Sequence, residues 1–427
     1  MDKFVINGGA RLKGEVAISG AKNAALPILA ASILSEGPSS LWGVPDLADV
    51  RTMGELLGDL GVAVRRDPDG RLHVAVEDEG SSHAQYDRVR KMRASICVLG
   101  PLLAKRKFAR VAMPGGCAIG PRPVDLHLRG LKALGAQIDL DSGDIVATAP
   151  KLVGTSIFLG GAFGSTVLGT SNVMMAAALA EGRTVIESAA CEPEVVDLAD
   201  YLNAMGARIT GAGSPRIVID GVDRLHGTEH KVIPDRIEAG TFMVAAAITN
   251  GEVTLSNVRT DHLMAVVDKL QEIGVFIEPK NGKVVVSSAR RLEPTDLTTQ
   301  PYPGFPTDLQ AQLMAILCLA DGISAITERI FPDRFMHLAE LLRMGANIRK
   351  EGSTAIVTGV RKLTGAPVMA SDLRASAALV LAGLVAKGQT TVSRVYHIDR
   401  GYERIETKLQ ALGADIRRVD GEDLPVT

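Results

Sequence analysis

The sequence lacks the cysteine spacing of a metal site or a disulfide framework. Its cysteines, Cys97, Cys117, Cys191 and Cys318, are widely separated and form no CxxC pair or Cys/His cluster. Structural zinc sites and disulfide-rich domains depend on closely spaced or paired cysteines. We therefore expect free thiols, no metal site and no cofactor.

The sequence also lacks a predominant charge and a long apolar run. Its 47 lysines and arginines stand against 49 aspartates and glutamates, which argues against a general binder of nucleic acid or of acidic membranes. The longest apolar stretches, such as residues 24–34, are shorter than the roughly 18 residues of a spanning helix. No export signal is visible at the start. These absences predict a cytoplasmic protein with neither nucleic acid nor membrane as a partner.

A short signature, an apolar residue followed by glycine and then alanine or valine, recurs six times. Apolar residues at helical spacing precede it, as at Leu198 and Leu202, so each glycine is predicted to end a helix in the left-handed conformation. Alternating strand-like residues and turn sequences such as 68–70 follow it and predict hairpins. The glycines are Gly61, Gly135, Gly206, Gly274, Gly345 and Gly413.

Each repeat also contains a second helix that is apolar nearly all round, as at 173–180, 242–248, 313–320 and 377–386, and such helices should be buried. A chain of 427 residues exceeds one usual core. Six such units could form an open solenoid, but two sets of three favour two closed α/β domains.

We place the first three-repeat domain at residues 22–233 and the second at 1–21 with 234–427. The first domain carries Cys117. The strand at residues 3–7 precedes the first repeat, and we expect it to complete a sheet of the other half.

Cations recur at the predicted starts of the buried helices. Free N–H groups and the helix dipole attract anions there. Capping by Asn, Asp, Ser or Thr explains any single start better, but it does not explain the cations, which the dipole disfavours. The pattern therefore predicts a site for small anions. The six starts read Lys22-Asn23, Arg93-Ala-Ser95, Ser171-Asn172, Asp235-Arg236, Thr307-Asp308 and Asp372-Leu-Arg374.

Three further segments carry candidate chemistry. Residues 114–123 form a glycine- and proline-rich loop in which Arg122 would favour a thiolate at Cys117, although a lone cysteine is more often buried and inert. Residues 300–308 bring Asp308 to a helix start, either as an N-cap or as a general base.

The third segment, 396–403, holds Arg400, for which a surface ion pair with Asp399 or Glu403 is the alternative. We interpret the histidines His127, His337 and His397 as structural.

These motifs together resemble the UDP-N-acetylglucosamine enolpyruvyl transferases, over essentially the whole chain. The resemblance implies two inside-out α/β domains of three repeats each, with the active site in the inter-domain cleft at the starts of the central helices. The matching segments are 19–28, 117 with 122–127, 303–308, 334–337, 372–376 and 397–404.

The resemblance implies a reaction in which the enolpyruvyl group of phosphoenolpyruvate moves to the 3′-hydroxyl of UDP-N-acetylglucosamine. Phosphate is released through a tetrahedral intermediate, in the first committed step of peptidoglycan synthesis. Cys117 would supply a proton and can bind phosphoenolpyruvate covalently, and Asp308 would deprotonate or orient the sugar hydroxyl.

The resemblance also assigns binding residues. Phosphoenolpyruvate would be held by Lys22, Asn23, Arg122 and Arg400. The UDP-sugar would contact Arg93, Arg122, Pro123, Val124, Asp125, Leu126, Asp308 and Ile330. The cleft would be supported by Arg334, Asp372 and Arg374.

One stretch departs from the family. Residues 166–170 read Thr-Val-Leu-Gly-Thr where members usually read Ser-Val-Gly-Ala-Thr, and Val153 replaces a commonly basic residue. Both changes fall where the uridine diphosphate should lie.

Two other functions compete with this interpretation. A sister enzyme that acts on shikimate 3-phosphate shares the fold but lacks the Pro-Gly-Gly-Cys loop. A non-catalytic repeat scaffold gives no reason for the recurring charged residues.

Overall fold

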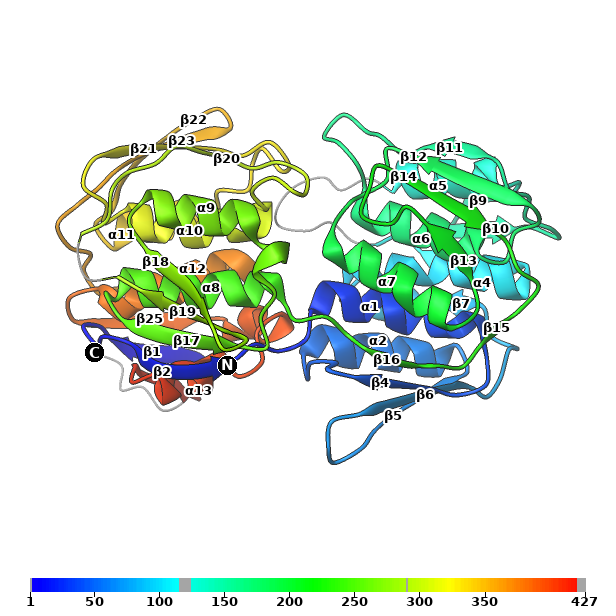
Figure 1. Cartoon of the computed structure of the whole chain (residues 1–427), viewed down its shortest axis with the longest axis horizontal. Helices are drawn as coiled ribbons and strands as arrows, with labels where there is room; N and C mark the ends of the chain where they lie inside the picture. The colour runs from blue at the N-terminus through cyan, green and yellow to red at the C-terminus, as the bar shows by residue number, and fades with distance from the viewer. Residues whose placement is uncertain (1, 115–123, 289–290, 421–427) are drawn as a thin grey trace. The chain divides into compact units, whose positions relative to one another are not determined.

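The computed structural model describes residues 2–114, 124–288 and 291–420, which divide into two compact units (Figure 1). The N-terminal unit comprises residues 20–114 and 124–233. The C-terminal unit comprises residues 2–19 and 234–420. Each unit has a hydrophobic core of its own.

In the N-terminal unit, three buried helices lie inside and four-stranded sheets lie outside (Figure 1). The buried helices are α1 (Lys22–Ala31), α4 (Leu99–Arg106), which follows the 3-10 turn η2 (Arg93–Val98), and α6 (Val167–Ala177). The half-exposed helices are α2 (Ala48–Asp59), α5 (Asp125–Ala133) and α7 (Pro193–Ala204), and α3 (Tyr86–Val89) is a short turn.

The sheets of this unit have the strand orders β16-β4-β6-β5, β7-β8-β10-β9 and β11-β12-β14-β13, and β15 pairs with β3. The strands are β3 (Ser35–Glu36), β4 (Ser39–Trp42), β5 (Val62–Arg66), β6 (Leu72–Val76), β7 (His83–Ala84), β8 (Phe108–Ala112), β9 (Gln137–Asp141), β10 (Asp144–Thr148), β11 (Ser156–Phe158), β12 (Arg183–Glu187), β13 (Arg208–Thr210), β14 (Arg216–Asp220), β15 (Leu225–His226) and β16 (Glu229–Lys231).

The C-terminal unit repeats this plan. Its buried helices are α8 (Arg236–Ile248), α10 (Gln310–Leu317), which follows η4 (Thr307–Leu309), and α12 (Leu373–Val385). Its half-exposed helices are α9 (Met264–Glu272), α11 (His337–Arg343) and α13 (Ile405–Ala411), with 3-10 turns η3 (Thr260–His262) and η5 (Val395–Arg400).

The sheets of this unit have the orders β18-β19-β17-β2, β20-β21-β23-β22 and β24-β25-β1-β26. The strands are β1 (Lys3–Asn7), β2 (Lys13–Ala17), β17 (Glu252–Ser256), β18 (Phe276–Lys280), β19 (Lys283–Ser287), β20 (Leu297–Thr298), β21 (Ile323–Thr327), β22 (Asn347–Glu351), β23 (Thr354–Thr358), β24 (Pro367–Met369), β25 (Gln389–Ser393) and β26 (Asp415–Val419). The predicted repeat architecture, with helices inside and sheets outside, is confirmed.

Strand β1 confirms the prediction for residues 3–7. It lies antiparallel between β25 and β26, the place that the second strand of a hairpin fills in the other sheets. Strand β2 likewise pairs in parallel with β17, and β16 supplies the equivalent edge beside β4. In the C-terminal unit, then, β1 and β2 come from the start of the chain, whereas the edge strand β16 of the N-terminal unit comes from the end of that unit.

The signature glycines end the half-exposed helices as predicted. Gly135, directly after α5, has a φ of +102°, and the equivalent glycines have φ between +78° and +106°. Glycine has no Cβ to clash in this left-handed conformation, so it lets the chain leave the helix and begin the next strand.

The start of α6 corrects the prediction for the third buried helix. We expected this helix to begin at Ser171-Asn172, but it begins at Val167, and the Thr166 hydroxyl accepts a hydrogen bond from the Gly169 N–H at 3.2 Å. Thr166 is a capping residue, and Gly169 is tolerated in the first turn. Ser171 and Asn172 are therefore buried inside the helix, not exposed at its start.

Two glycine substitutions in the N-terminal unit test the role of the signature. Gly135→Ala should lower the free energy of unfolding by about 1 kcal/mol, because alanine is strained at positive φ although the nearest atom to its Cβ is 3.7 Å away. Gly58→Ala, inside α2 with no atom within 4 Å of its Cβ, should instead stabilise by about 0.5 kcal/mol. Urea unfolding of both variants measures the difference, and equal effects of the two changes would contradict a conformational role.

Candidate functional site

Asp308 is the centre of a charged cluster in the C-terminal unit. It lies in η4, the first turn of the α10 helix, and its side chain is about a quarter exposed. Arg334 Nη1 donates to Asp308 Oδ1 at 2.8 Å, and Arg374 Nε lies 3.5 Å from Asp308 Oδ2. One carboxylate that reaches solvent is thus held between two buried guanidinium groups.

Arg374 is buried with hydrogen-bonding capacity to spare. Its side chain is only 2% exposed, and none of its three guanidinium nitrogens makes a hydrogen bond of good geometry with a described residue, although Asp308 and Tyr402 both interact with its charge. Its Cζ lies 5.1 Å from the ring centre of Tyr402. A buried guanidinium with unused donors is costly, and its planar donors suit a carboxylate or a phosphate group.

The starts of α8 and α12 are capped by aspartates, as the sequence predicted. Asp372 Oδ1 accepts from the N–H groups of Arg374 and Ala375 at 2.8 and 3.1 Å. Asp235 caps α8 in the same way. Asp372 therefore supports the site by fixing the turn that carries Arg374.

The helix starts at Arg93 and at Arg374 have similar sequences but differ in the structure. Arg374 is buried in the second position of a capped α-helix, whereas Arg93 begins η2 and is partly exposed. Lys22 begins α1 and is buried, with Nζ 3.3 Å from Asp49 Oδ2. Asn23 is partly exposed in the next position of α1. The N-terminal unit thus presents two cations at helix starts.

The remaining predicted UDP-sugar residues lie at two turns. Val124 is the N-cap position of α5, followed by Asp125, which is exposed, and Leu126, which is partly buried. In the C-terminal unit Ile330 is partly buried, and its N–H donates to Glu328 Oε1 at 2.9 Å. Arg400 is the last residue of η5 and is half-buried, while the alternative partner Asp399 is engaged by Arg418.

Glu328 is a candidate positioning residue that the sequence analysis missed. Its side chain is fully buried, and Oε1 accepts from the Thr299 hydroxyl at 2.6 Å and from two N–H groups at 330–331. Oε2 accepts from the Thr307 hydroxyl at 2.9 Å. Glu328 thereby ties the turn of Ile330 to the turn of Asp308. A glutamate at the end of a strand gives no sequence signal that separates it from surface glutamates.

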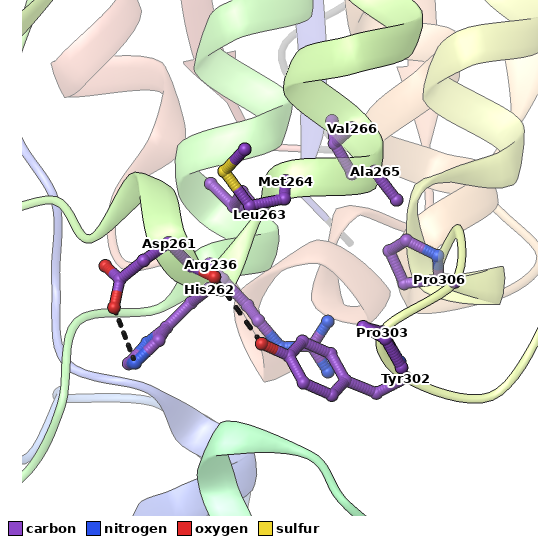
Figure 2. A pocket seen from close by; sticks show the side chains of 11 residues that line it. Arg236, Asp261, His262, Leu263, Met264, Ala265, Val266, Tyr302, Pro303 and Pro306 are labelled. Carbon is purple, nitrogen blue, oxygen red and sulfur yellow. Dashed lines mark hydrogen bonds and ion pairs between the residues drawn. The ribbon is translucent and has the colours of Figure 1, made fainter.

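A small cavity of about 70 Å³ lies beside the loop that leads to Asp308 (Figure 2). Tyr302 and Pro303 form one wall, and Arg236, at the start of α8, lies 5.5 Å from the Tyr302 ring centre. The Tyr302 hydroxyl donates to the Asp261 carbonyl at 3.5 Å. These contacts join the loop to the segment before α9. They therefore help to fix the conformation of the loop that precedes Asp308.

Three of the predicted site residues, Cys117, Arg122 and Pro123, lie outside the described residues. Of the other thiols, Cys97 and Cys318 are buried, and burial raises the pKa of each to about 12. Thiols with such pKa values are protonated and unreactive at neutral pH. Cys97 and Cys318 are therefore core residues.

The predicted structural histidines lie in packed surroundings. The ring of His127 is buried, with Nδ1 3.1 Å from the Asn172 amide nitrogen. Burial lowers the pKa of His337 to about 4, and the pKa of His397 is also lowered, by burial and by Arg400.

Over residues 2–114, 124–288 and 291–420 no group of three His, Cys, Asp or Glu side chains is placed to hold a metal ion. Nor is any helix in those ranges long and apolar enough to cross a membrane.

Comparison with known proteins identifies the family. The family model described as EPSP synthase (3-phosphoshikimate 1-carboxyvinyltransferase) matches residues 6–409. The chain belongs to this family of carboxyvinyltransferases. The enolpyruvyl transferase resemblance read from the motifs is thereby confirmed.

Relatives of this carboxyvinyltransferase are similar over their full length. A UDP-N-acetylglucosamine 1-carboxyvinyltransferase 2 of Carboxydothermus hydrogenoformans is 56% identical over 421 residues, covering 98% of this chain and all of that one. A UDP-N-acetylglucosamine 1-carboxyvinyltransferase of Akkermansia muciniphila is 52% identical over 426 residues, with 99% and 100% coverage.

Solved structures agree with the fold. The enolpyruvyl transferase NikO from Streptomyces tendae superposes with a TM-score of 0.89 at 25% identity, over 98% of this chain and 99% of that one. An EPSP synthase from Acinetobacter baumannii has a TM-score of 0.76 at 20% identity, over 98% and 100%. This second likeness shows the fold alone.

His337, next to the charged cluster, predicts a pH dependence of stability. Its pKa is about 4 in the folded protein and about 6.5 when unfolded, because burial disfavours the charged ring. The unfolded chain then binds the proton first, so acidification from pH 6.5 to 4 should remove about 3 kcal/mol of stability. His337→Gln should abolish this part of the slope in urea unfolding.

His226, which is exposed, provides the control. His226→Gln should leave the pH dependence of unfolding unchanged. If His337→Gln also leaves it unchanged, the ring is not held neutral by burial.

Proposed function

We propose that this enzyme transfers the enolpyruvyl group of phosphoenolpyruvate to the 3′-hydroxyl of UDP-N-acetylglucosamine and releases phosphate. The main support is the full-length identity of 52–56% with several proteins named for that activity. The match to the shikimate-type enzyme rests on a family model and on a 20% identical structure, so that alternative is weaker. A non-catalytic scaffold is excluded by membership of an enzyme family.

Asp308 acts on the acceptor hydroxyl. In the reaction, the hydroxyl oxygen bonds to the carbon that carries the phosphate, a proton adds to the methylene carbon, and the adduct then loses phosphate while a proton leaves the new methyl group. A carboxylate held in place by two guanidinium groups can accept the hydroxyl proton or orient the hydroxyl. The ion pairs also fix its direction, which supports a positioned base.

Three cations balance the charge of phosphoenolpyruvate. Lys22, Arg122 and Arg400 hold its phosphate and carboxylate, with Asn23 as a neutral partner. Lys22 lies at the start of α1, where free N–H groups add to its attraction for an anion. The guanidinium nitrogens of Arg374 are available as hydrogen-bond donors. Arg374 binds the same anion or the adduct formed from it.

Cys117 supplies the proton to the methylene carbon and carries the covalent phosphoenolpyruvate adduct. Asp308 and Cys117 fall in different three-repeat domains, at 1–21 with 234–427 and at 22–233, so the proposed reaction uses residues of both. Arg334 and Asp372 support the residues contributed by the second domain. No cofactor takes part.

The UDP-sugar contacts Arg93, Ile330 and the run Arg122, Pro123, Val124, Asp125 and Leu126. Val153, which is half exposed, and Thr166, which caps α6, replace usual family residues on the uridine diphosphate side. This chain therefore binds the diphosphate with fewer cations there. By the role of its product, the enzyme serves cell-wall growth, cell shape and division in the cytoplasm.

Phosphate release tests the proposed reaction. Incubation with phosphoenolpyruvate and UDP-N-acetylglucosamine should release one phosphate for each sugar nucleotide consumed, measured by a colorimetric phosphate assay. Shikimate 3-phosphate in place of the sugar nucleotide should give no release, and the reverse pattern would contradict the assignment.

Two variants locate the chemistry in the same assay. Cys117→Ala and Asp308→Asn should each lower the rate of phosphate release by at least about 100-fold, the scale of a lost acid or base. Cys191→Ala is the matched thiol control and should keep the full rate. Full activity of Cys117→Ala would remove the proposed acid.

A further inference from the structure

A second, larger cavity of about 400 Å³ lies in the C-terminal unit at the far ends of the buried helices. It is lined by the last residues of α8 and α12 and by Ile316 and Leu319 at the end of α10. Asp308 and Asp372 lie at the opposite ends of α10 and α12, so this cavity is separate from the proposed active site.

The cavity is lined by cations that the repeat brings together. Three equivalent loops read Arg11-Leu12, Arg291-Leu292 and Lys362-Leu363, and Arg361 adds a fourth charge. Each leucine is buried, at 0%, 6% and 0% exposure. The leucine anchors its loop in the core, and the preceding cation is left at the cavity. None of the described residues that line the cavity is acidic.

Neutralisation of the helix C-termini is the competing explanation, because cations stabilise the negative end of a helix. Arg291 fits it. Arg291 donates to the carbonyls of Leu319 and Ala320 at 3.1 and 3.0 Å and pairs with Asp321 at 3.0 Å.

The other three cations do not fit the capping explanation. Arg11, Arg361 and Lys362 make no hydrogen bond or ion pair with any residue in the described parts of the chain. All three are exposed residues that line the cavity, and none of their charges is paired with an acidic side chain of the described chain.

The N-terminal unit offers an internal comparison. There the cation-leucine pair occurs in two loops, before Leu152 and Leu225, and Lys151 of the first is ion-paired with Glu181. Lys105, at the end of α4, pairs with Glu36 at 3.2 Å. Both described cations at the equivalent end of that unit thus have acidic partners, whereas of the four cations at the cavity of the C-terminal unit Arg291 alone forms an ion pair within the described chain.

We propose that this cavity binds a small phosphorylated ligand of the nucleoside diphosphate class. Two arginines and a lysine without protein partners are suited to phosphate oxygens. Ile248, Leu292 and Ile316 give the cavity an apolar floor, which suits a flat base, and its volume is within the range of small-molecule sites. This site is independent of the proposed reaction.

Calorimetric titration of the full chain with adenosine diphosphate tests the site. UDP-N-acetylglucosamine is kept at saturation so that the proposed active site is filled. One equivalent of adenosine diphosphate should bind, with an affinity that falls as salt rises. The triple variant Arg11→Gln, Arg361→Gln, Lys362→Gln should weaken binding at least tenfold.

A second triple variant makes the same change in net charge elsewhere on this unit. Lys280→Gln, Arg349→Gln, Arg417→Gln alters exposed cations away from the cavity and should bind like the unchanged protein. Equal urea midpoints of the two triple variants establish that both are folded.

Three results would overturn the proposal. The first is the absence of adenosine diphosphate binding to the unchanged protein. The second is an equal loss of binding in both triple variants, which would indicate attraction by net charge alone. The third is equal affinity for inorganic pyrophosphate, which would show that the apolar floor contributes nothing and would exclude a nucleoside ligand.

Discussion

The charged cluster at Asp308 depends on a guanidinium group that the fold buries without satisfying it. Arg374 brings a permanent charge into the core, where desolvation would destabilise the unit unless opposite charge lay nearby. Asp308 supplies that charge, and Arg334 shares it. The nitrogens of Arg374 nevertheless make no hydrogen bond of good geometry in the described chain, so the guanidinium keeps donors that suit a further anion. The unsatisfied group connects the fold to the proposed chemistry.

The repeat explains how such a cluster can be assembled. Each unit places three buried helices inside its sheets, and the turn before each helix enters the core at an equivalent point. Residues distant in sequence, such as Asp308 and Arg374, are thus brought within ion-pair distance at helix starts. The same repetition places Arg11, Arg291 and Lys362 together at the other helix ends. The threefold repeat therefore produces two charged clusters in the C-terminal unit, one at each end of its buried helices.

Much of the fold could be predicted from the sequence, because its signals are local. A glycine after an amphipathic run demands positive φ, and Gly135 adopts it. Asp372 before an apolar run predicts a cap, and it caps α12. The predicted start of the third buried helix, at Ser171-Asn172, was wrong by several residues, because Thr166 caps the helix and Gly169 is accommodated in its first turn.

The site was predictable in part. Charge at helix starts indicated Lys22, Asp308 and Arg374, and the structure brings the last two together. Glu328 could not be found, since its role depends on partners at Thr299 and Thr307, which only the folded chain brings to it. Burial, likewise, distinguishes Arg374 from Arg93 although their sequence phrases match.

The stabilising effect of substrate on Arg374→Met would test the central claim most directly. Methionine fills much of the same volume without charge, and replacing a buried ion with an apolar side chain is often neutral or stabilising. Thermal unfolding should show that the ligand-free variant is at least nearly as stable as the unchanged protein. Phosphoenolpyruvate with UDP-N-acetylglucosamine should raise the unfolding midpoint of the unchanged protein and have little effect on the variant. An undiminished midpoint shift in Arg374→Met would show that the buried guanidinium does not await an anionic ligand.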